Sequence, residues 1–384
     1  MSGLKNFSLK YSTVQLYFGR GALSNAVGFL KGFGNVCIVT SRSAAKVSGA
    51  LSDVDKLLKE LGAQYFIYDK ISPNPWANQA EELGYMLWSE GADLAIAIGG
   101  GSVIDAAKVA SIIALSGGRV ADYVLGRKCK RMLPLLAINL THGTGSEVDR
   151  YAVLTLGDSR EKHGIDARYP DLSIDDPVYT TTLSKAQTIY TTLDAFYHSY
   201  ESATAITANQ LVDTLSSEAI SIVASTLPEL TNDLSNISLR AKALYSSMIA
   251  GISIDLSSTH IVHAIEHAVS GLEPKLPHGC GLGILGPKAV YYTHKSMPEK
   301  SAKLLKPLDP ELKPLSEHAE RASKAIQLFQ ESVGFKERLS DYGFTEGDVD
   351  RVIEYTLRRL KYMTLDAPFN VTEDVVRNIF LSSL

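Results

Sequence analysis

Residues 94–108 read LAIAIGGGSVIDAAK, and this stretch decides the class of fold. The segment from Leu94 to Ile98 is a near-continuous apolar run, as expected for a strand of a parallel sheet that is covered on both faces. The glycines after it let a backbone approach a phosphate group closely, and the helix that they open presents free N–H groups and the positive end of its dipole. The sequence therefore predicts a strand, a phosphate-binding turn and a helix, in this order.

The rest of the first half continues this alternation of strand and helix. Apolar, β-rich runs alternate with segments whose apolar residues recur at helical spacing. The predicted order is strand 36–40, helix 44–61, strand 64–68, helix 76–89 and strand 94–98. Such alternation favours a doubly wound α/β domain with a mostly parallel sheet. We place this domain at residues 1–182.

From about Ser184 onward the pattern is helical, with few strand signals. We expect Pro228, Gly271 and Pro274 to end helices. The predicted helices cover residues 211–227, 238–253, 259–270, 316–333 and 349–359. The second half therefore predicts an all-α domain over residues 183–384.

A second loop of small residues, Thr141 to Glu147 (THGTGSE), follows a predicted strand at 135–140. Loops at the carboxyl ends of strands in one parallel sheet meet at a common crevice, which is where open α/β sheets bind ligands. Glycine-rich turns also occur for purely structural reasons, but both loops carry hydroxyls as well as glycines. We favour a shared ligand-binding edge over two ordinary turns.

Side chains able to bind a metal gather in two clusters of the predicted all-α domain. Asp194 and His198 stand four residues apart, as do His263 and His267, and His278 follows. An i, i+4 spacing puts both side chains of a pair on one face of a helix. A lone histidine on a helix is more often a core or surface residue, but two such pairs and a further histidine are harder to explain that way. One carboxylate and several imidazoles suit a divalent first-row metal such as Fe(II) or Zn(II).

The composition narrows the class of protein. The chain has 384 residues, 45% hydrophobic and 21% charged, with a net charge of −4, so we expect a globular protein without nucleic acid or a membrane as partner. It contains no run of eighteen apolar residues, and its first residues do not resemble a secretory signal. Three widely spaced cysteines fit reduced thiols. These features predict a cytoplasmic protein.

Several motifs together resemble those of the iron-containing (group III) alcohol dehydrogenases. They are GGGSVIDAAK, THGTGSE, DAFYHSYES, HAIEH…PHG, the Phe18–Gly21 turn and the SPNP loop at 72–75, and they span nearly all of residues 15–290 in unbroken order. The resemblance implies a dehydroquinate synthase-like fold, with the active site in the cleft between an α/β dinucleotide-binding domain and an all-α metal-binding domain. It also implies hydride transfer between an alcohol and an aldehyde or ketone with NAD(P), and a homodimer.

The resemblance also implies roles for individual residues. The metal ligands would be Asp194, His198, His263 and His278, and His267 would stand beside the reacting carbon without binding the metal. Predicted cofactor contacts are Asn74, Gly100, Gly101, Ser102, Asp105, Thr141, Thr144 and Lys162. The metal would be Fe(II), with Zn(II) as the alternative because both accept these ligands.

Two departures from the family pattern stand out. The family has Thr-Gly shortly before the ligand aspartate, whereas this chain has Thr191-Thr192-Leu193, so the helix start can differ. The fifteen-residue spacing from His263 to His278 is one longer than in close relatives. We place the extra residue in the loop 271–277, which can absorb it without moving the preceding helix.

The residues after the strand ending at Thr40 bear on the choice of cofactor. Members of the family that prefer NAD look to carry an aspartate directly after this strand. Its carboxylate accepts a hydrogen bond from the ribose 2′-OH and repels a 2′-phosphate. This chain has Ser41-Arg42-Ser43 instead. A guanidinium flanked by hydroxyls suits a phosphate, although Arg42 could equally be a solvated surface residue. We predict that Ser41 and Arg42 favour NADP over NAD.

Three other functions remain open. A glycerol or glycerol-1-phosphate dehydrogenase and a dehydroquinate synthase-type lyase share this fold, but a phosphorylated or anionic substrate needs basic residues, and segments 194–202 and 259–283 supply only Lys275. A nucleotide-binding scaffold without chemistry would be expected to lose its metal ligands first, and the four are present. Reduction of NADP by a simple primary alcohol separates the dehydrogenase from the lyase and the scaffold.

Overall fold

The computed structural model describes residues 4–157 and 159–384, which cluster into two compact units. The N-terminal unit extends to Ser184 and includes Leu234–Leu244, and the C-terminal unit comprises Lys185–Asp233 and Tyr245–Leu384. The division after residue 184 lies two residues beyond the expected boundary, and the sequence analysis did not assign 234–244 to the first unit.

Arg240 gives the physical reason for that assignment. Its side chain is fully buried, and its guanidinium donates to Nε2 of His142 at 2.9 Å and to the carbonyl of Leu183 at 3.2 Å. A buried cation must be hydrogen-bonded to be tolerated. Both partners belong to the N-terminal unit, so these bonds tie the segment 234–244 to it.

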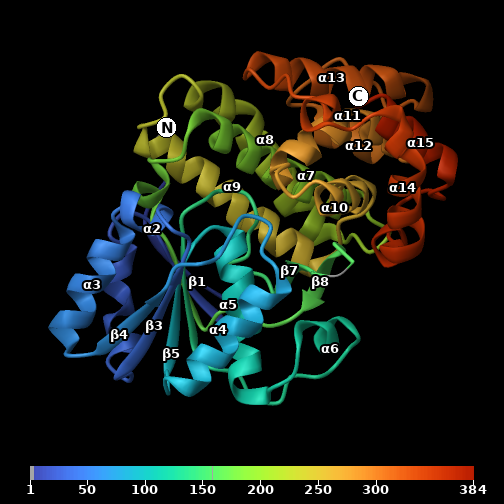
Figure 1. The fold of residues 1–384 in the computed structure, drawn as a ribbon. Coiled ribbons are helices and arrows are strands. Elements are labelled where there is room, and N and C mark those ends of the chain that lie inside the picture. Colours follow the sequence, from blue (N-terminus) through green and yellow to red (C-terminus); the bar gives the residue numbers. More distant parts are fainter. Residues whose placement is uncertain (1–3, 158) are drawn as a thin grey trace. The chain divides into compact units, whose positions relative to one another are not determined.

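A seven-stranded sheet forms the centre of the N-terminal unit, in the order β1-β2-β9-β6-β5-β3-β4. The strand bounds, in sheet order, are Phe7–Tyr11, Val14–Phe18, Leu172–Asp175, Leu135–Asn139, Leu94–Gly99, Asn35–Thr40 and Gln64–Tyr68. All neighbours pair in parallel except β1 with β2. The mostly parallel α/β sheet predicted from the sequence is confirmed (Figure 1).

Both faces of this sheet are covered, as the continuous apolar strands predicted. On β3, Cys37 and Val39 pack with α4 (Ala77–Ser89) and α5 (Gly101–Ser116), whereas Val36 and Ile38 pack with α1 (Val27–Leu30) and α3 (Ala50–Leu61). Alternate residues of a strand point to opposite faces, so every position of β3 but the first is buried.

Some elements of this unit differ from the prediction. The expected helix 44–61 is two helices, α2 (Ala44–Val47) and α3, because Gly49 adopts a φ of +85° that a right-handed helix excludes. A two-stranded antiparallel hairpin, β7 (Tyr151–Thr155) with β8 (Lys162–Asp166), and a short helix, α6 (Val120–Val124), were not predicted.

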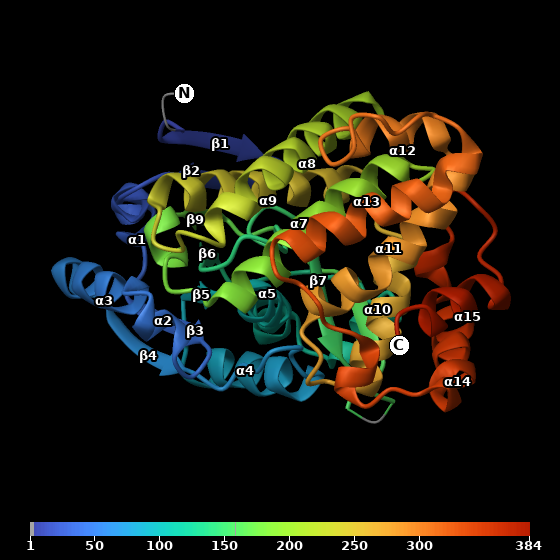
Figure 2. The same ribbon diagram turned by 90° about the horizontal axis from the view of Figure 1, so that it is seen from above.

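Helices make up the C-terminal unit, as expected (Figure 2). Their bounds are α7 Lys185–Thr204, α8 Gln210–Leu230, α9 Ile237–Leu256, α10 Ile261–Leu272, α11 His278–Ser296, α12 Pro298–Leu305, α13 Ala319–Ser332, α14 Val349–Glu354 and α15 Glu373–Leu381. The start of α9, up to Leu244, belongs to the N-terminal unit. The prediction that Pro228 ends a helix was wrong, since α8 continues to Leu230. Pro228 removes one helical hydrogen bond, because it has no N–H to donate to the carbonyl four residues earlier, and α8 ends two residues after it.

Helix α11 was not predicted, because its sequence holds four glycines and Pro287. Its close packing explains the glycines. A Cβ at Gly279 would overlap the carbonyl oxygen of Tyr190, and one at Gly286 would overlap the ring of Tyr197, both on α7. Tertiary packing here overrides poor helix propensity, and it brings α11 against the helix that carries Asp194.

Among the described residues, no single helix has both the length and the apolar composition needed to cross a membrane. Helices α9 and α10 meet these two requirements when they are counted as one segment, but a sharp bend separates them.

Candidate functional site

Four side chains of the C-terminal unit converge as the sequence predicted. Asp194, His198, His263 and His278 each offer a ligand atom, and these four atoms all lie within 4.8 Å of one another. Asp194 and His198 come from α7, His263 from α10, and His278 is the first residue of α11. The three helices pack against one another, so long-range packing and not local sequence closes the cluster.

The distances within the cluster fit a shared ion. Oδ1 of Asp194 lies 3.5 Å from Nε2 of His198, 3.8 Å from Nε2 of His263 and 3.7 Å from Nε2 of His278. These separations exceed an ordinary hydrogen bond. Bonds of about 2.1 Å to one tetrahedral metal would set its ligands about 3.4 Å apart, which is close to what is found.

Two of these atoms are buried without a hydrogen bond to any described residue: Oδ1 of Asp194 and Nε2 of His263. A buried polar atom that lacks a partner costs free energy. A divalent cation would satisfy both atoms at once, so the donor set fits a metal.

The other ring nitrogens of two histidines are held by buried carboxylates. Nδ1 of His263 lies 2.6 Å from Oε2 of Glu201, and Nδ1 of His278 is hydrogen-bonded to Oε2 of Glu266. Both glutamates are fully buried. Metal-binding histidines commonly donate their second N–H to a carboxylate in this way.

The charges of the cluster stabilise one another. Burial alone would raise the pKa of Asp194, but the nearby His198, His263 and His278 outweigh it and lower that pKa from 3.8 to about 2. Glu201 shows the same balance, with His260 and His263 lowering its pKa to about 2 despite burial. Burial lowers the pKa of His263, yet the carboxylates of Asp194 and Glu201 raise it to about 9. The site thus keeps its carboxylates ionised, as cation binding requires.

His267 lies beside the four converging side chains without belonging to their group. It is one turn after His263 on α10, with ring centroids 6.5 Å apart, and its ring is 5.6 Å from that of His278. With Glu266 and His278 it forms a second close group of donor atoms. This second group shares His278 with the first, and the hydrogen bond between Glu266 and His278 accounts for part of its closeness.

Neither Glu201 nor Glu266 was predicted from the sequence. Both carried a signal that could have been used: each is an acidic residue three positions after a histidine of the cluster, His198 and His263 respectively. That spacing places a side chain one turn along the same helix.

The predicted edge of the parallel sheet is also present. Strand β5 pairs with β3 on one side and β6 on the other, so the turns after Thr40, Gly99 and Asn139 leave the sheet at the same end. A Cβ at Gly100 would meet Cγ2 of Thr141 at 2.7 Å, and one at Gly101 would meet Cγ2 of Thr144 at 2.6 Å. The two loops therefore touch, and the glycines are needed for that contact.

The remaining predicted cofactor residues also lie in the N-terminal unit. Ser41 is half-buried and Arg42 exposed after β3, and Ser102 lies in the first turn of α5. Asn74 is buried in a left-handed conformation with φ +49°, and Lys162 is the buried first residue of β8. The carboxylate of Asp105 accepts hydrogen bonds from the Ser146 hydroxyl and the Val153 amide, so it also joins α5 to both neighbouring segments.

The two departures from the family pattern leave the cluster intact. Helix α7 begins at Lys185, so Thr191 and Thr192 lie inside it and Asp194 is well past its start. The connection between α10 and α11 comprises residues 273–277, slightly shorter than expected.

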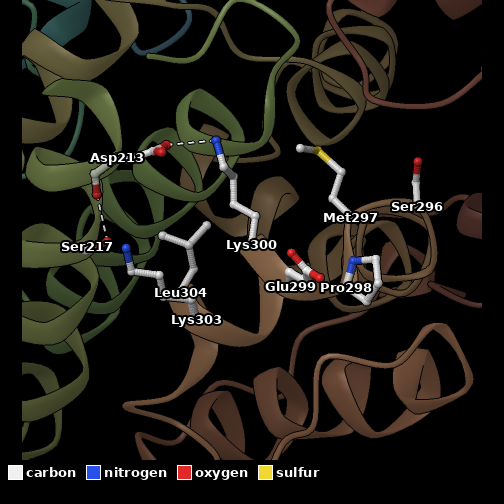
Figure 3. A pocket seen from close by; sticks show the side chains of 9 residues that line it. All are labelled: Asp213, Ser217, Ser296, Met297, Pro298, Glu299, Lys300, Lys303 and Leu304. Carbon is white, nitrogen blue, oxygen red and sulfur yellow. Dashed lines mark hydrogen bonds and ion pairs between the residues drawn. The ribbon is translucent and has the colours of Figure 1, made fainter. Parts of the chain in front are cut away.

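A separate hollow of about 600 Å³ lies along α8 and α12 of the C-terminal unit (Figure 3). An ion pair of 2.9 Å between Asp213 and Lys300 crosses it, and Ser217, Met297 and Lys303 also line it. None of the predicted site residues lies there, so the candidate site is the histidine cluster.

Known proteins resemble the chain over nearly its whole length. The model of the iron-containing alcohol dehydrogenase family matches residues 13–177, and that of the C-terminal part of the Fe-containing alcohol dehydrogenase family matches residues 188–384. A long-chain primary alcohol dehydrogenase of Thermoanaerobacter ethanolicus is 37% identical, over 96% of this chain and 95% of its own length.

Two further relatives agree. A probable NADH-dependent butanol dehydrogenase of Bacillus subtilis is 31% identical, over 91% of this chain and 93% of its own. The crystal structure of an archaeal alcohol dehydrogenase from a Red Sea brine pool superposes with a TM-score of 0.90 at 26% identity, covering 99% of both chains. Both halves of the sequence and the arrangement of its helices and strands thus lead to one conclusion: this chain belongs to the iron-containing alcohol dehydrogenase family.

Proposed function

We propose that this alcohol dehydrogenase interconverts a primary alcohol and its aldehyde, holds one Fe(II) ion by Asp194, His198, His263 and His278, and prefers NADP to NAD. The observation that carries the proposal is the convergence of one carboxylate oxygen and three imidazole nitrogens from three helices. Zn(II) is the alternative metal, because the same ligands accept it.

The metal, when bound, would act as a Lewis acid that lowers the pKa of a coordinated alcohol. Asp194 would supply the negative charge that retains a divalent cation, and burial excludes water that would compete for the ligands. Glu201 and Glu266 orient two of the imidazoles through their Nδ1 atoms. His267 would hold or pass a proton near the reacting carbon, a role for which histidine is suited near neutral pH.

The nicotinamide cofactor would bind in the N-terminal unit. The glycines of the turn after β5 and the N-terminus of α5 suit a pyrophosphate. Ser41 and Arg42 follow the neighbouring strand β3, and a guanidinium there favours a 2′-phosphate. The relative named as NADH-dependent makes this preference a point to test in this chain.

The scarcity of basic side chains around the proposed metal site favours an uncharged alcohol over a phosphorylated one as substrate. Segments 194–202 and 259–283 contain Lys275 as their single Lys or Arg, and phosphate recognition relies on such groups. We also propose that the protein acts as a homodimer in the cytoplasm, in keeping with the family resemblance and the reduced cysteines.

The test combines metal analysis with turnover. Protein purified without oxygen should carry about one iron per chain and should reduce NADP in the presence of a primary alcohol. Asp194→Ala should lose metal and turnover together. Asp213→Ala is a matched control, because Asp213 of α8 pairs with Lys300 of α12 at the separate hollow. Stoichiometric metal in Asp194→Ala would refute the ligand assignment.

A further inference from the structure

Glu201 serves three donors of α10 at once, and its Oε1 also lies 3.0 Å from Nδ1 of His260, just before that helix. Its Oε1 accepts the backbone N–H of Val262 at 2.7 Å, and its Oε2 accepts the backbone N–H of His263 at 3.3 Å. Oε2 also lies 2.6 Å from Nδ1 of the His263 ring. The carboxylate belongs to α7, whereas all three donors belong to the first turn of α10.

The backbone contacts act as a helix cap from outside the helix. The first N–H groups of a helix have no partner within it and need an acceptor. His260 is the N-cap residue of α10, but its side chain makes no capping bond. Glu201 supplies the missing acceptor, and its negative charge suits the positive end of the helix dipole.

The same carboxylate decides which nitrogen of His263 is available. An ionised carboxylate only accepts hydrogen bonds, so Nδ1 of His263 must carry the proton. Nε2 is then the nitrogen left to face a cation, 3.8 Å from Oδ1 of Asp194, and any proton that it carries has to leave when a metal binds. A neutral imidazole binds a metal through its unprotonated nitrogen.

We propose that Glu201 is a positioning residue that fixes both the start of α10 and the orientation of the His263 ring, with the protonated Nδ1 toward Glu201 and Nε2 toward the metal site. The inference rests on the proposed metal site and goes beyond it by naming a residue outside the ligand set. Because α10 also carries His267, one carboxylate sets the place of two of the histidines.

The Glu201→Gln variant tests the hydrogen bonds of Glu201 without changing the size of its side chain. Glutamine has the same size but one acceptor oxygen, so it cannot accept from both the Val262 N–H and the His263 ring. Its amide can instead donate to Nδ1, which moves the proton to Nε2 and blocks the ligand atom. Cobalt(II) is a suitable probe, with affinity measured by chelator competition and geometry by visible absorption.

We expect Glu201→Gln to weaken cobalt(II) binding about 10- to 100-fold, the range seen for such outer partners. The metal-free wild type should show a proton on Nδ1 of His263 by ¹⁵N NMR, and the variant should lose it. Tyr200→Phe is the matched control: it removes another buried polar atom of α7, bonded to Ser301 at 2.7 Å, and it should leave cobalt affinity and the Nδ1 proton unchanged.

The outcomes are distinct. Failure of the wild type to bind cobalt stoichiometrically would overturn the proposed metal site itself. Wild-type affinity and an unchanged Nδ1 proton in Glu201→Gln would overturn only the role of Glu201. If the variant does not fold, the metal-free wild type still decides, since an Nδ1 of His263 that carries no proton would contradict the proposal.

Discussion

His263 and His267 lie on one helix, yet one turn gives them different surroundings. His263 faces Asp194 and Glu201, two carboxylates, and is part of the four-residue group. His267 lies outside that group, beside His278. The difference makes His263 a ligand in our proposal and leaves His267 for proton transfer.

His267→Ala should therefore keep the metal and lose turnover. We expect a fall in kcat of about 10²- to 10⁴-fold, which is what positioned acid–base groups contribute, with metal content near that of wild type. Metal analysis and steady-state kinetics on the same preparation check this. Loss of the metal would mean that the roles of His263 and His267 are exchanged.

The cofactor preference can be tested at two adjacent residues. A charge-assisted contact to the 2′-phosphate is worth roughly 1.5–3 kcal/mol, or about ten- to a hundred-fold in affinity. Ser41→Asp should reverse the ratio of kcat/KM for NADP and NAD by adding a repulsive charge. Arg42→Ala should weaken NADP more than NAD. Equal use of both cofactors by wild type, unaltered in either variant, would refute the argument.

At the scale of elements, the contact between the turns after β5 and β6 makes Gly101 a sensitive position. A Cβ there would lie 2.6 Å from Cγ2 and 2.8 Å from Oγ1 of Thr144. Overpacking of this kind costs about 1–3 kcal/mol.

Gly101→Ala should thus lower the free energy of unfolding by that amount and weaken dinucleotide binding, measured by chemical denaturation and by cofactor titration. Gly28→Ala is the control, since a Cβ at Gly28 meets no atom within 4 Å and the residue is exposed on α1. If Gly101→Ala and Gly28→Ala unfold with the same free energy, the turns after β5 and β6 can move apart without destabilising the protein, which would contradict the prediction.

Elements also show what could be predicted from the sequence. The i, i+4 pairs of α7 and α10 and the apolar strands were predictable, because spacing and local pattern determine them. Helix α11 was not, because its glycines are explained by contacts with Tyr190 and Tyr197 some ninety residues away. Glu201 was not predicted for a related reason. Its partners lie on another helix, and only the folded chain brings them together.

For the whole molecule, buried ionisable groups set how stability depends on pH. Burial, aided by Arg240, lowers the pKa of His142 from 6.5 to about 3. Between pH 3 and 6.5, therefore, His142 is protonated in the unfolded chain but not in the folded one. The contribution of neutral His142 to the free energy of unfolding is fully present above pH 6.5. It falls by about 1.4 kcal/mol for each pH unit below that.

His142→Asn should flatten this dependence, seen as a smaller slope of unfolding free energy against pH between 5 and 6.5. Glu147 offers a control of opposite sign. Burial, with Asp149 nearby, raises its pKa from 4.5 to about 7, so its contribution is present below pH 4.5 and lost as the pH rises through 7. Glu147→Gln should therefore make stability rise more steeply with pH. Parallel curves for wild type and both variants would contradict these assignments.

The bonds from Arg240 to His142 and Leu183 have a consequence for synthesis of the chain. A ribosome releases residues in sequence order, so α7 and α8 emerge before Arg240 exists. A nascent chain that stops at residue 184 holds all seven strands of the sheet but leaves His142 without the guanidinium that binds it. Domains generally fold as units during translation, the first-made one first. Here the half that is made first is completed only by residues that are translated after part of the second half.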